Sequence, residues 1–352
     1  MSEVQIIFDH LESACCPEDV FGAGDDPIAV YRRLARACHP DLHKDSIAKE
    51  AFQKLNALKD EADERIKRGE WGKRLPLAHC VPMEIGKYKV RRKSIVGDIA
   101  DLYLVEGSCR IVKVARNHDD NDLMRAEAEA LRILDGITGP VRDGVPILAE
   151  SFQIEGRWKR EANVIADFPK FVTAQAVHEK MIVDARTAVW MFKRILSLLT
   201  WVHHFGLVHG AILPPHVMFY PDNDGGKDID PRKHSIRMID WCYSVDFKKR
   251  TRLSSWVPAW KKYYAPELLD KSSIGPTSDI YMATTLIGYL INDDRSTSNA
   301  LNLPSGLRTV LLKCTEPNPA KRYQKAGEVL EAWKSAAKAA FGEPKWHDFN
   351  VL

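Results

Sequence analysis

Residues 208–219 read Val-His-Gly-Ala-Ile-Leu-Pro-Pro-His-Val-Met-Phe, and residues 239–242 read Ile-Asp-Trp-Cys. A long run with helical periodicity, residues 188–205, comes shortly before the first of these stretches. Several short strand-like runs lie closer to the N-terminus, between residues 88 and 168. Because strands come first and long helices follow, this order predicts an α+β domain whose sheet is built from its N-terminal part.

One of the strand-like runs, Ile-Val-Lys-Val-Ala at residues 111–115, carries a lysine in its centre. A helical run follows in which Glu127, Leu131 and Leu134 share one face. A buried ammonium without a partner is costly to desolvate, so Lys113 needs a nearby acid. We therefore predict that Glu127 is the partner of Lys113.

Three further landmarks follow in order: Tyr264-Ala-Pro-Glu267, Ser278-Asp-Ile-Tyr281 and Asn318-Pro-x-x-Arg322. Together with the stretches above, they resemble the protein-kinase family across residues 86–335. The resemblance implies a bilobal fold with a small lobe at residues 86–168 and a large lobe at residues 169–335.

The resemblance also implies a role for individual residues. The nucleotide site would contain Gly97, Lys113, Glu127 and Asp240, with ATP as the ligand and Asp240 as the residue that holds magnesium. Three other residues would be structural: Glu267 and Arg322 would form the buried pair that pins the activation segment, and Asp279 would brace the catalytic loop.

The positions that perform phosphate transfer depart from the family pattern. Active members carry His-Arg-Asp and, five residues after that aspartate, an asparagine; Gly210, Ala211 and His216 stand at the corresponding positions here. Ala211 has no atom that can accept a hydroxyl proton, and His216 is a poor substitute for an oxygen ligand of magnesium. Loss of a positioned base alone removes about two to four orders of magnitude in rate. We therefore predict a pseudokinase without catalytic residues.

Two alternatives stay open at this stage. Lys113, Glu127 and Asp240 either bind a nucleotide or form only a satisfied ionic cluster in the cleft. The chain is either a non-enzyme or an atypical active serine/threonine kinase in which a displaced acid, Asp222 or Asp224, replaces the absent base.

The first seventy residues contain two amphipathic helical patterns. Ile28, Tyr31, Leu34, Ala35 and Cys38 fall on one arc of the first pattern, and Arg32, Arg33 and Arg36 fall on another. In the second pattern Ile47, Ala51, Leu55, Leu58 and Ala62 recur every three or four residues. We expect the two helices to pack as an antiparallel hairpin with His39-Pro40-Asp41 at its tip, because proline biases the residue before it away from helical geometry.

These residues, together with Phe52-x-x-Leu55-Asn-Ala57, resemble the J-domain of the DnaJ family over about residues 16–68. The resemblance implies a partner, a seventy-kilodalton heat-shock chaperone ATPase. It also implies the residues that bind this partner: Arg32, Arg33, Arg36, His39, Pro40 and Asp41. The plainer alternative is that His-Pro-Asp only ends a helix and that the arginines form a solvated helix face.

Glycines and prolines break the helical pattern between the two regions, at Gly69, Gly72 and Pro76. We predict a J-domain at residues 1–70, a linker at 71–85, a kinase-like domain at 86–335 and a C-terminal tail at 336–352. The combined function is that of a co-chaperone or adaptor that brings an unknown protein client to the chaperone.

Composition limits the environment and the partners. The formal net charge of the 352-residue chain is only +3, so nucleic acid is not an expected partner. The seven cysteines contain no C-x-x-C pair, which fits a reducing compartment better than a disulfide framework or a zinc site. No uncharged apolar stretch approaches about 18 residues, so we expect a cytoplasmic protein without a membrane partner.

Overall fold

The computed structural model describes residues 3–14, 17–21, 27–44, 46–69, 71, 83–90, 95–136, 141–156, 159–221, 234–249, 252–270, 273–292, 303–344, 349 and 351. The chain divides into an N-terminal unit, Met1–Gly97 with Asp101–Val112, and a C-terminal unit, Asp98–Ala100 with Lys113–Leu352. This division does not follow the expected linker at 71–85, and the domain boundaries stay predictions.

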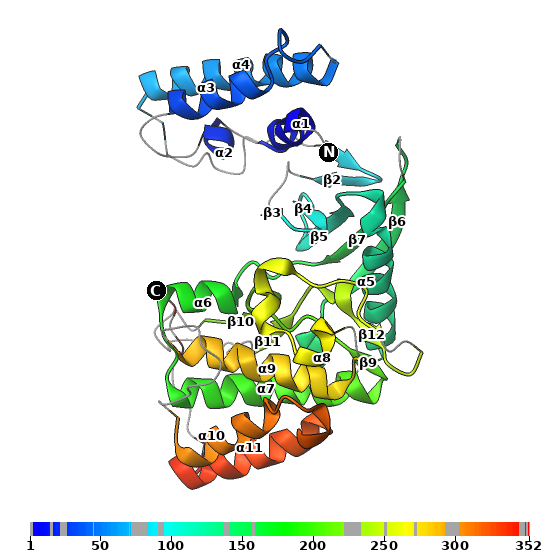
Figure 1. Cartoon of the computed structure of the whole chain (residues 1–352), viewed down its shortest axis with the longest axis vertical. Coiled ribbons are helices and arrows are strands. Elements are labelled where there is room, and N and C mark those ends of the chain that lie inside the picture. The colour runs from blue at the N-terminus through cyan, green and yellow to red at the C-terminus, as the bar shows by residue number, and fades with distance from the viewer. Residues whose placement is uncertain are drawn as a thin grey trace. The chain divides into compact units, whose positions relative to one another are not determined.

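Four helices begin the N-terminal unit: α1 (Glu3–Ser13), α2 (Pro17–Phe21), α3 (Pro27–Ala37) and α4 (Ser46–Lys67) (Figure 1). α3 and α4 are the two expected helices. They are antiparallel, because Tyr31 near the middle of α3 bonds Asn56 while His39 after its end packs on Phe52 near the start of α4.

The core of this helical region is wider than a hairpin. Ala51, Leu55 and Ala62 of α4 are fully buried, and α1 supplies Ile7 and Leu11 to the same cluster. The sequence prediction missed α1 and α2. It was also wrong about Ile28, which lies in the first turn of α3 and is 43% exposed instead of packed.

The strands between residues 83 and 166 are short. They are β1 (Met83–Ile85), β2 (Tyr88–Val90), β3 (Ile95–Val96), β4 (Ala100–Leu104), β5 (Arg110–Ala115), β6 (Leu148–Ile154) and β7 (Arg160–Ala166). β1 pairs with β2, and the larger sheet has the order β3-β4-β5-β7-β6. β6 and β7 form a hairpin in which Ile154 faces Arg160 and Leu148 faces Ile165. The sheet-first order of the kinase-like region is therefore confirmed.

The C-terminal unit is mostly helical: α5 (Asn121–Leu134), α6 (Ala174–Lys180), α7 (Ala185–His204), α8 (Pro266–Leu269), α9 (Pro276–Ile291), α10 (Ser305–Cys314) and α11 (Ala326–Phe341). Besides β6 and β7, the described part of this unit contains five shorter strands: β8 (Val172–Thr173), β9 (Leu207–Val208), β10 (Val217–Phe219), β11 (Ile236–Met238) and β12 (Val245–Asp246). α9 is almost wholly buried, and α7 packs against both α9 and α11. This helical core supports the loops that follow β9 and β11.

α11 runs past the expected domain end at residue 335 and ends at Phe341. Beyond it, the ring of Phe349 is buried against Trp190 of α7, with ring centroids 5.5 Å apart. Among the described residues, no helix is long and apolar enough to span a lipid bilayer.

Candidate functional site

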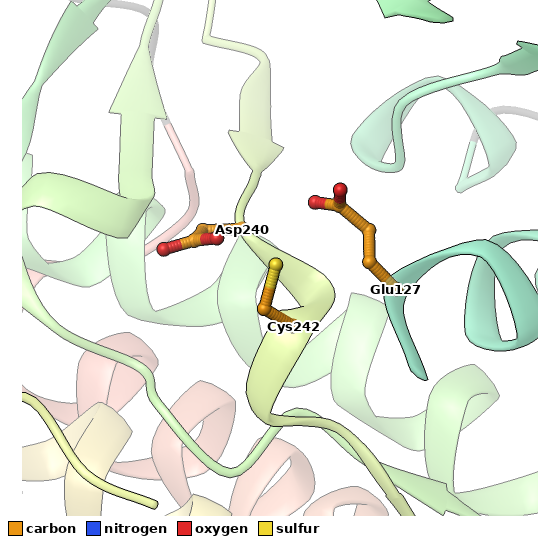
Figure 2. A group of neighbouring side chains, drawn as sticks. All are labelled: Glu127, Asp240 and Cys242. Atoms are coloured by element: carbon orange, nitrogen blue, oxygen red, sulfur yellow. The ribbon is translucent and has the colours of Figure 1, made fainter. Parts of the chain in front are cut away.

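Lys113 lies in β5 with its ammonium surrounded by three acceptors. Nζ lies 2.9 Å from Oε1 of Glu127 and 3.1 Å from Sγ of Cys242, and it also bonds Oδ1 of Asp240. The three acceptors lie together between α5 and the turn after β11 (Figure 2). A lysine ammonium has three N–H donors, so all the donors of Lys113 are used within the protein.

Glu127 of α5 is fully buried and held on its second oxygen as well. Oε2 of Glu127 accepts a hydrogen bond of 3.0 Å from Nδ2 of Asn163, which also donates to the carbonyl of Met124. The predicted pairing of Lys113 with Glu127 is thus present. The sequence analysis did not name Asn163. An asparagine inside the buried strand β7 could have indicated a polar cluster, because a buried amide needs hydrogen-bond partners.

Asp240 follows β11 in the left-handed region, with φ 63° and ψ 61°, which few residues other than glycine adopt. This turn directs its carboxylate to two cationic side chains. Oδ1 bonds Lys113, and Oδ2 lies 3.0 Å from Nε2 of His216. Both oxygens of Asp240 are therefore engaged.

The other ring nitrogen of His216, Nδ1, lies 2.9 Å from the carbonyl oxygen of Ala211. A carbonyl oxygen and a carboxylate oxygen can only accept hydrogen bonds, so both ring nitrogens of His216 must donate. The ring is then an imidazolium. Asp240 consequently lies between two cations, the ammonium of Lys113 and the imidazolium of His216.

The electrostatics follow from this pairing. Burial is the largest single influence on Lys113 and disfavours its charged form, but its three acceptors, Asp240 first, together outweigh burial, and the pKa of Lys113 lies well above its usual value. Burial likewise opposes ionisation of Asp240, but Lys113 and then His216 hold its pKa well below the usual range. Burial, and next the charge of Glu127, raises the pKa of Cys242 far above that of a free thiol. The thiol therefore stays protonated and inert.

These residues do not fit a magnesium ion as they are arranged. Magnesium requires oxygen ligands in near-octahedral geometry. At the position of the family's asparagine, His216 offers two N–H donors and no lone pair. Two cations next to Asp240 also repel a third. The expectation that Asp240 holds magnesium is therefore not supported by this geometry, and Glu127, Asp240 and Cys242 enclose an ammonium instead of a metal.

Asp279 of α9 fixes the loop that follows β9 through hydrogen bonds. Its carboxylate accepts hydrogen bonds from the backbone N–H groups of His209 (2.8 Å) and Gly210 (3.0 Å), as predicted for a brace of this loop. The ring of His203 also lies 3.1 Å from Asp279. Ala211 is fully buried at the position of the family's base.

His209 is a buried neutral ring. Nε2 lies 3.0 Å from the carbonyl of Ile239 and donates to it, while Nδ1 accepts from the backbone N–H of Ala211 at 3.3 Å. Burial lowers the pKa of His209 to about 4, which agrees with a ring that has one donor and one acceptor nitrogen.

The second structural pair is also present. Both guanidinium ends of Arg322 donate to the two carboxylate oxygens of Glu267 at 2.8 Å, and Oγ of Ser278 donates to Oε1 of Glu267 at 2.8 Å. Such a two-point pair is rigid and directional. It anchors α8 to the loop before α11.

A separate candidate site surrounds the turn between α3 and α4. A surface hollow of about 540 Å³ is lined by Tyr31, Arg32, Ala35, Arg36, His39, Asp41, Leu42 and Phe52. Nδ1 of His39 accepts from the backbone N–H of Asp41 at 3.2 Å, and the His39 ring packs edge-on against Phe52 at 4.9 Å. The side chain of Asp41 is left 89% exposed.

The turn therefore brings together four of the six residues named for chaperone binding: Arg32, Arg36, His39 and Asp41 line one hollow. Pro40 lies in the turn and Arg33 is exposed on α3. Leu42, which the sequence reasoning did not name, is 65% exposed beside Asp41. Gly97 lies between β3 and β4, and its nucleotide role stays a prediction. Asp222 and Asp224 lie outside the described residues.

No protein-family model matches the chain, and no curated protein matches it. The structure is similar to the crystal structure of the Mycobacterium tuberculosis PknI kinase domain, with a TM-score of 0.53, 16% identity, and coverage of 73% of this chain and 98% of that one. It is equally similar to a cysteine-to-alanine mutant of the same domain, with a TM-score of 0.53, 15% identity and the same coverage. At this identity the likeness concerns the fold alone. The chain thus contains a protein-kinase-like fold.

Proposed function

We propose that this protein is a J-domain co-chaperone or adaptor in which an N-terminal helical region engages a seventy-kilodalton heat-shock chaperone, and a catalytically impaired kinase-like domain binds a partner or client. The observation that carries the proposal is the turn between α3 and α4. There a basic helix, an exposed Asp41 and an exposed Leu42 border one hollow.

The chemistry of that hollow favours an acidic partner with an apolar contact. Arg32 and Arg36 bring two cations from consecutive turns of α3, and complementary charges steer association. His39 is fixed by Phe52 and by the Asp41 backbone, so the turn is preorganised and little ordering is required on binding.

The kinase-like cleft supports a non-enzymatic role for the second domain. Ala211 provides no base, and every donor of Lys113 is already engaged by Glu127, Asp240 and Cys242. A phosphate could reach Lys113 only by displacing one of them. We propose that the cluster stabilises the shape of the domain, and that ATP, where it binds, does so without magnesium.

The test is binding to the purified host chaperone in its ATP state, measured by biolayer interferometry. Replacing Arg32 and Arg36 together by Glu should weaken binding at least about tenfold and remove its salt dependence. Arg68→Glu, just beyond the far end of α4, is the matched control and should bind like the unmodified chain. Equal binding by the double variant would refute the proposed contact.

The rival function is an active serine/threonine kinase that uses Asp222 or Asp224 as its base. Incubation with γ-labelled ATP and generic protein substrates, alongside a Lys113→Ala variant, decides between the two. We expect no label above the level of that variant. Label that depends on Lys113 would favour the rival.

A further inference from the structure

A pocket of about 620 Å³ lies between α7 and α11 in the C-terminal unit. None of the residues of the Lys113 cluster or of the α3–α4 turn belongs to it. Its floor is apolar and aromatic, formed by Trp190 and Val189 of α7 and by Trp333 and Ala337 of α11. The ring of His234 stacks on Trp190 at 4.5 Å. Trp190 and Trp333 are almost fully buried, so an apolar group of a ligand would contact mainly the partly exposed Val189, Ala337 and Phe341 above them.

The rim of this pocket is strongly basic. Five cationic side chains line it: Arg186, Lys193 and Arg194 of α7, and Lys334 and Lys338 of α11. Glu343 is the one carboxylate among the described residues of the lining. Residues seven or eight apart on α7, and four apart on α11, fall on the same side of each helix, so the five cations face one opening. A ligand held there must carry negative charge.

The cations are only partly neutralised by the protein. Lys338 pairs with Glu343 at 2.6 Å and Lys334 with Glu331 at 2.7 Å, in exposed pairs of the kind that contribute little. Within the described part of the chain, Lys193 and Arg194 have no ion-pair partner. Both side chains are exposed and line the pocket, so a ligand with two negative groups can pair with both.

A second, independent observation also points to a ligand. Trp190 is 8% exposed, yet no group in the described ranges accepts a hydrogen bond from its indole N–H. The indole N–H of Trp333 on the same floor donates to the carbonyl of Val189 at 3.1 Å. A buried N–H without an acceptor costs about 1–3 kcal/mol. The nitrogen is itself buried, so an acceptor oxygen brought by a ligand would remove that cost only if the side chains around Trp190 move.

We propose that this pocket binds an acidic peptide segment that carries one large apolar side chain. The apolar side chain rests on the apolar lining of the pocket, carboxylates pair with Lys193 and Arg194, and an oxygen of the peptide accepts from the N–H of Trp190 once the side chains around that ring move. A peptide fits better than nucleic acid, because the rim surrounds an apolar floor instead of following an open groove along a phosphate backbone.

The experiment measures fluorescence anisotropy of a fluorescein-labelled decapeptide of aspartate and glutamate with a single central phenylalanine, added to the full-length chain. We expect saturable binding. A peptide with alanine in place of phenylalanine, and one with glutamine and asparagine in place of the acids, should each bind at least about tenfold more weakly. Equal binding of the alanine peptide would show that the site recognises only charge, and it would overturn the proposal.

Variants locate the site. The double change Lys193→Glu with Arg194→Glu should weaken binding at least about tenfold, and Trp190→Phe, which keeps the apolar ring and removes the N–H, should weaken it several-fold. Arg132→Glu on α5 is the matched control and should have no effect. The proposal is wrong if the labelled peptide fails to saturate, if the α7 variant binds normally while its thermal unfolding is unchanged, or if a ten-nucleotide oligo-dT binds more tightly than the peptide.

Discussion

Nε2 of His216 lies 3.0 Å from Oδ2 of Asp240, and the opposite nitrogen of the same ring lies 2.9 Å from the carbonyl of Ala211. One side chain thus joins Ala211 to Asp240, the two positions for which the kinase resemblance implied a base and a metal ligand. An imidazolium at this place supplies positive charge that a metal ion would otherwise supply. Both carboxylate oxygens of Asp240 are thereby paired within the protein.

Replacing His216 by the asparagine of the family pattern should restore room and an oxygen ligand for a divalent ion. We expect magnesium to raise the thermal unfolding temperature of His216→Asn in the presence of ATP, because a ligand that binds only the folded state stabilises it. The unmodified chain and a His204→Asn control should show no magnesium effect. A magnesium-dependent rise of equal size in the unmodified chain would show that His216 does not exclude the metal.

Removal of Lys113 should be strongly destabilising. Lys113→Ala leaves the buried carboxylates of Glu127 and Asp240 without their shared cation, and breaking a buried pair in this way costs about 3–5 kcal/mol. Lys334→Ala removes a lysine from an exposed pair in the same unit and should cost less than about 1 kcal/mol. Urea unfolding of both variants measures the difference, and similar midpoints would mean that the cluster contributes no stability.

The backbone at Gly210 should tolerate no side chain. Its φ is +75°, and a Cβ atom there would overlap the carbonyl oxygen of Tyr243. Gly342 has nearly the same φ, +77°, with no described atom near the position of a Cβ. Its ψ of −154° belongs to a region that is essentially restricted to glycine, so Gly342→Ala should cost about 1–3 kcal/mol of backbone strain and no steric overlap. Gly210→Ala should cost clearly more in the same unfolding experiment, and equal costs would contradict the close approach of Tyr243.

Stability should fall in mild acid because of His209. Its pKa is about 4 in the folded protein against 6.5 for the unperturbed side chain, so below pH 6.5 the unfolded chain binds a proton that the folded chain does not. The free energy of unfolding contributed by this residue is then lost as pH falls from 6.5 towards 4, by about 2 kcal/mol at pH 5. Urea unfolding at pH 7.5 and pH 5 measures the loss, which should be smaller in His209→Gln. An unchanged pH dependence in that variant would contradict the buried neutral ring.

Local spacing predicted some of these contacts from the sequence alone. A lysine in an apolar strand needs an acidic partner, and Glu127 lies on the buried face of the next helix. Nζ of Lys113 is 2.9 Å from Oε1 of Glu127. Asp279 and the pair of Glu267 with Arg322 were placed by resemblance and contact the groups expected of them.

Contacts that depend on tertiary placement were not predictable in the same way. The contact between His216 and Asp240 depends on the left-handed backbone conformation of Asp240. The sequence Ile-Asp-Trp-Cys does not predict that conformation. Cys242, two residues further along, likewise reaches Lys113 only through the tertiary placement of this turn. The prediction that Ile28 is packed was wrong, because helical periodicity indicates which face of a helix is buried but not at which turn the burial begins. The helix α1 was readable, since Val4, Ile7 and Leu11 recur at helical spacing, and it was overlooked.

The most direct measurement is the single-turnover rate of ATP hydrolysis by the purified host chaperone, with and without this protein. The exposed carboxylate of Asp41 is the group that Asp41→Asn removes with almost no change of shape. We expect the unmodified chain to accelerate hydrolysis and Asp41→Asn to leave it at the basal rate. Equal acceleration by both proteins, or no acceleration by either, would contradict the co-chaperone function.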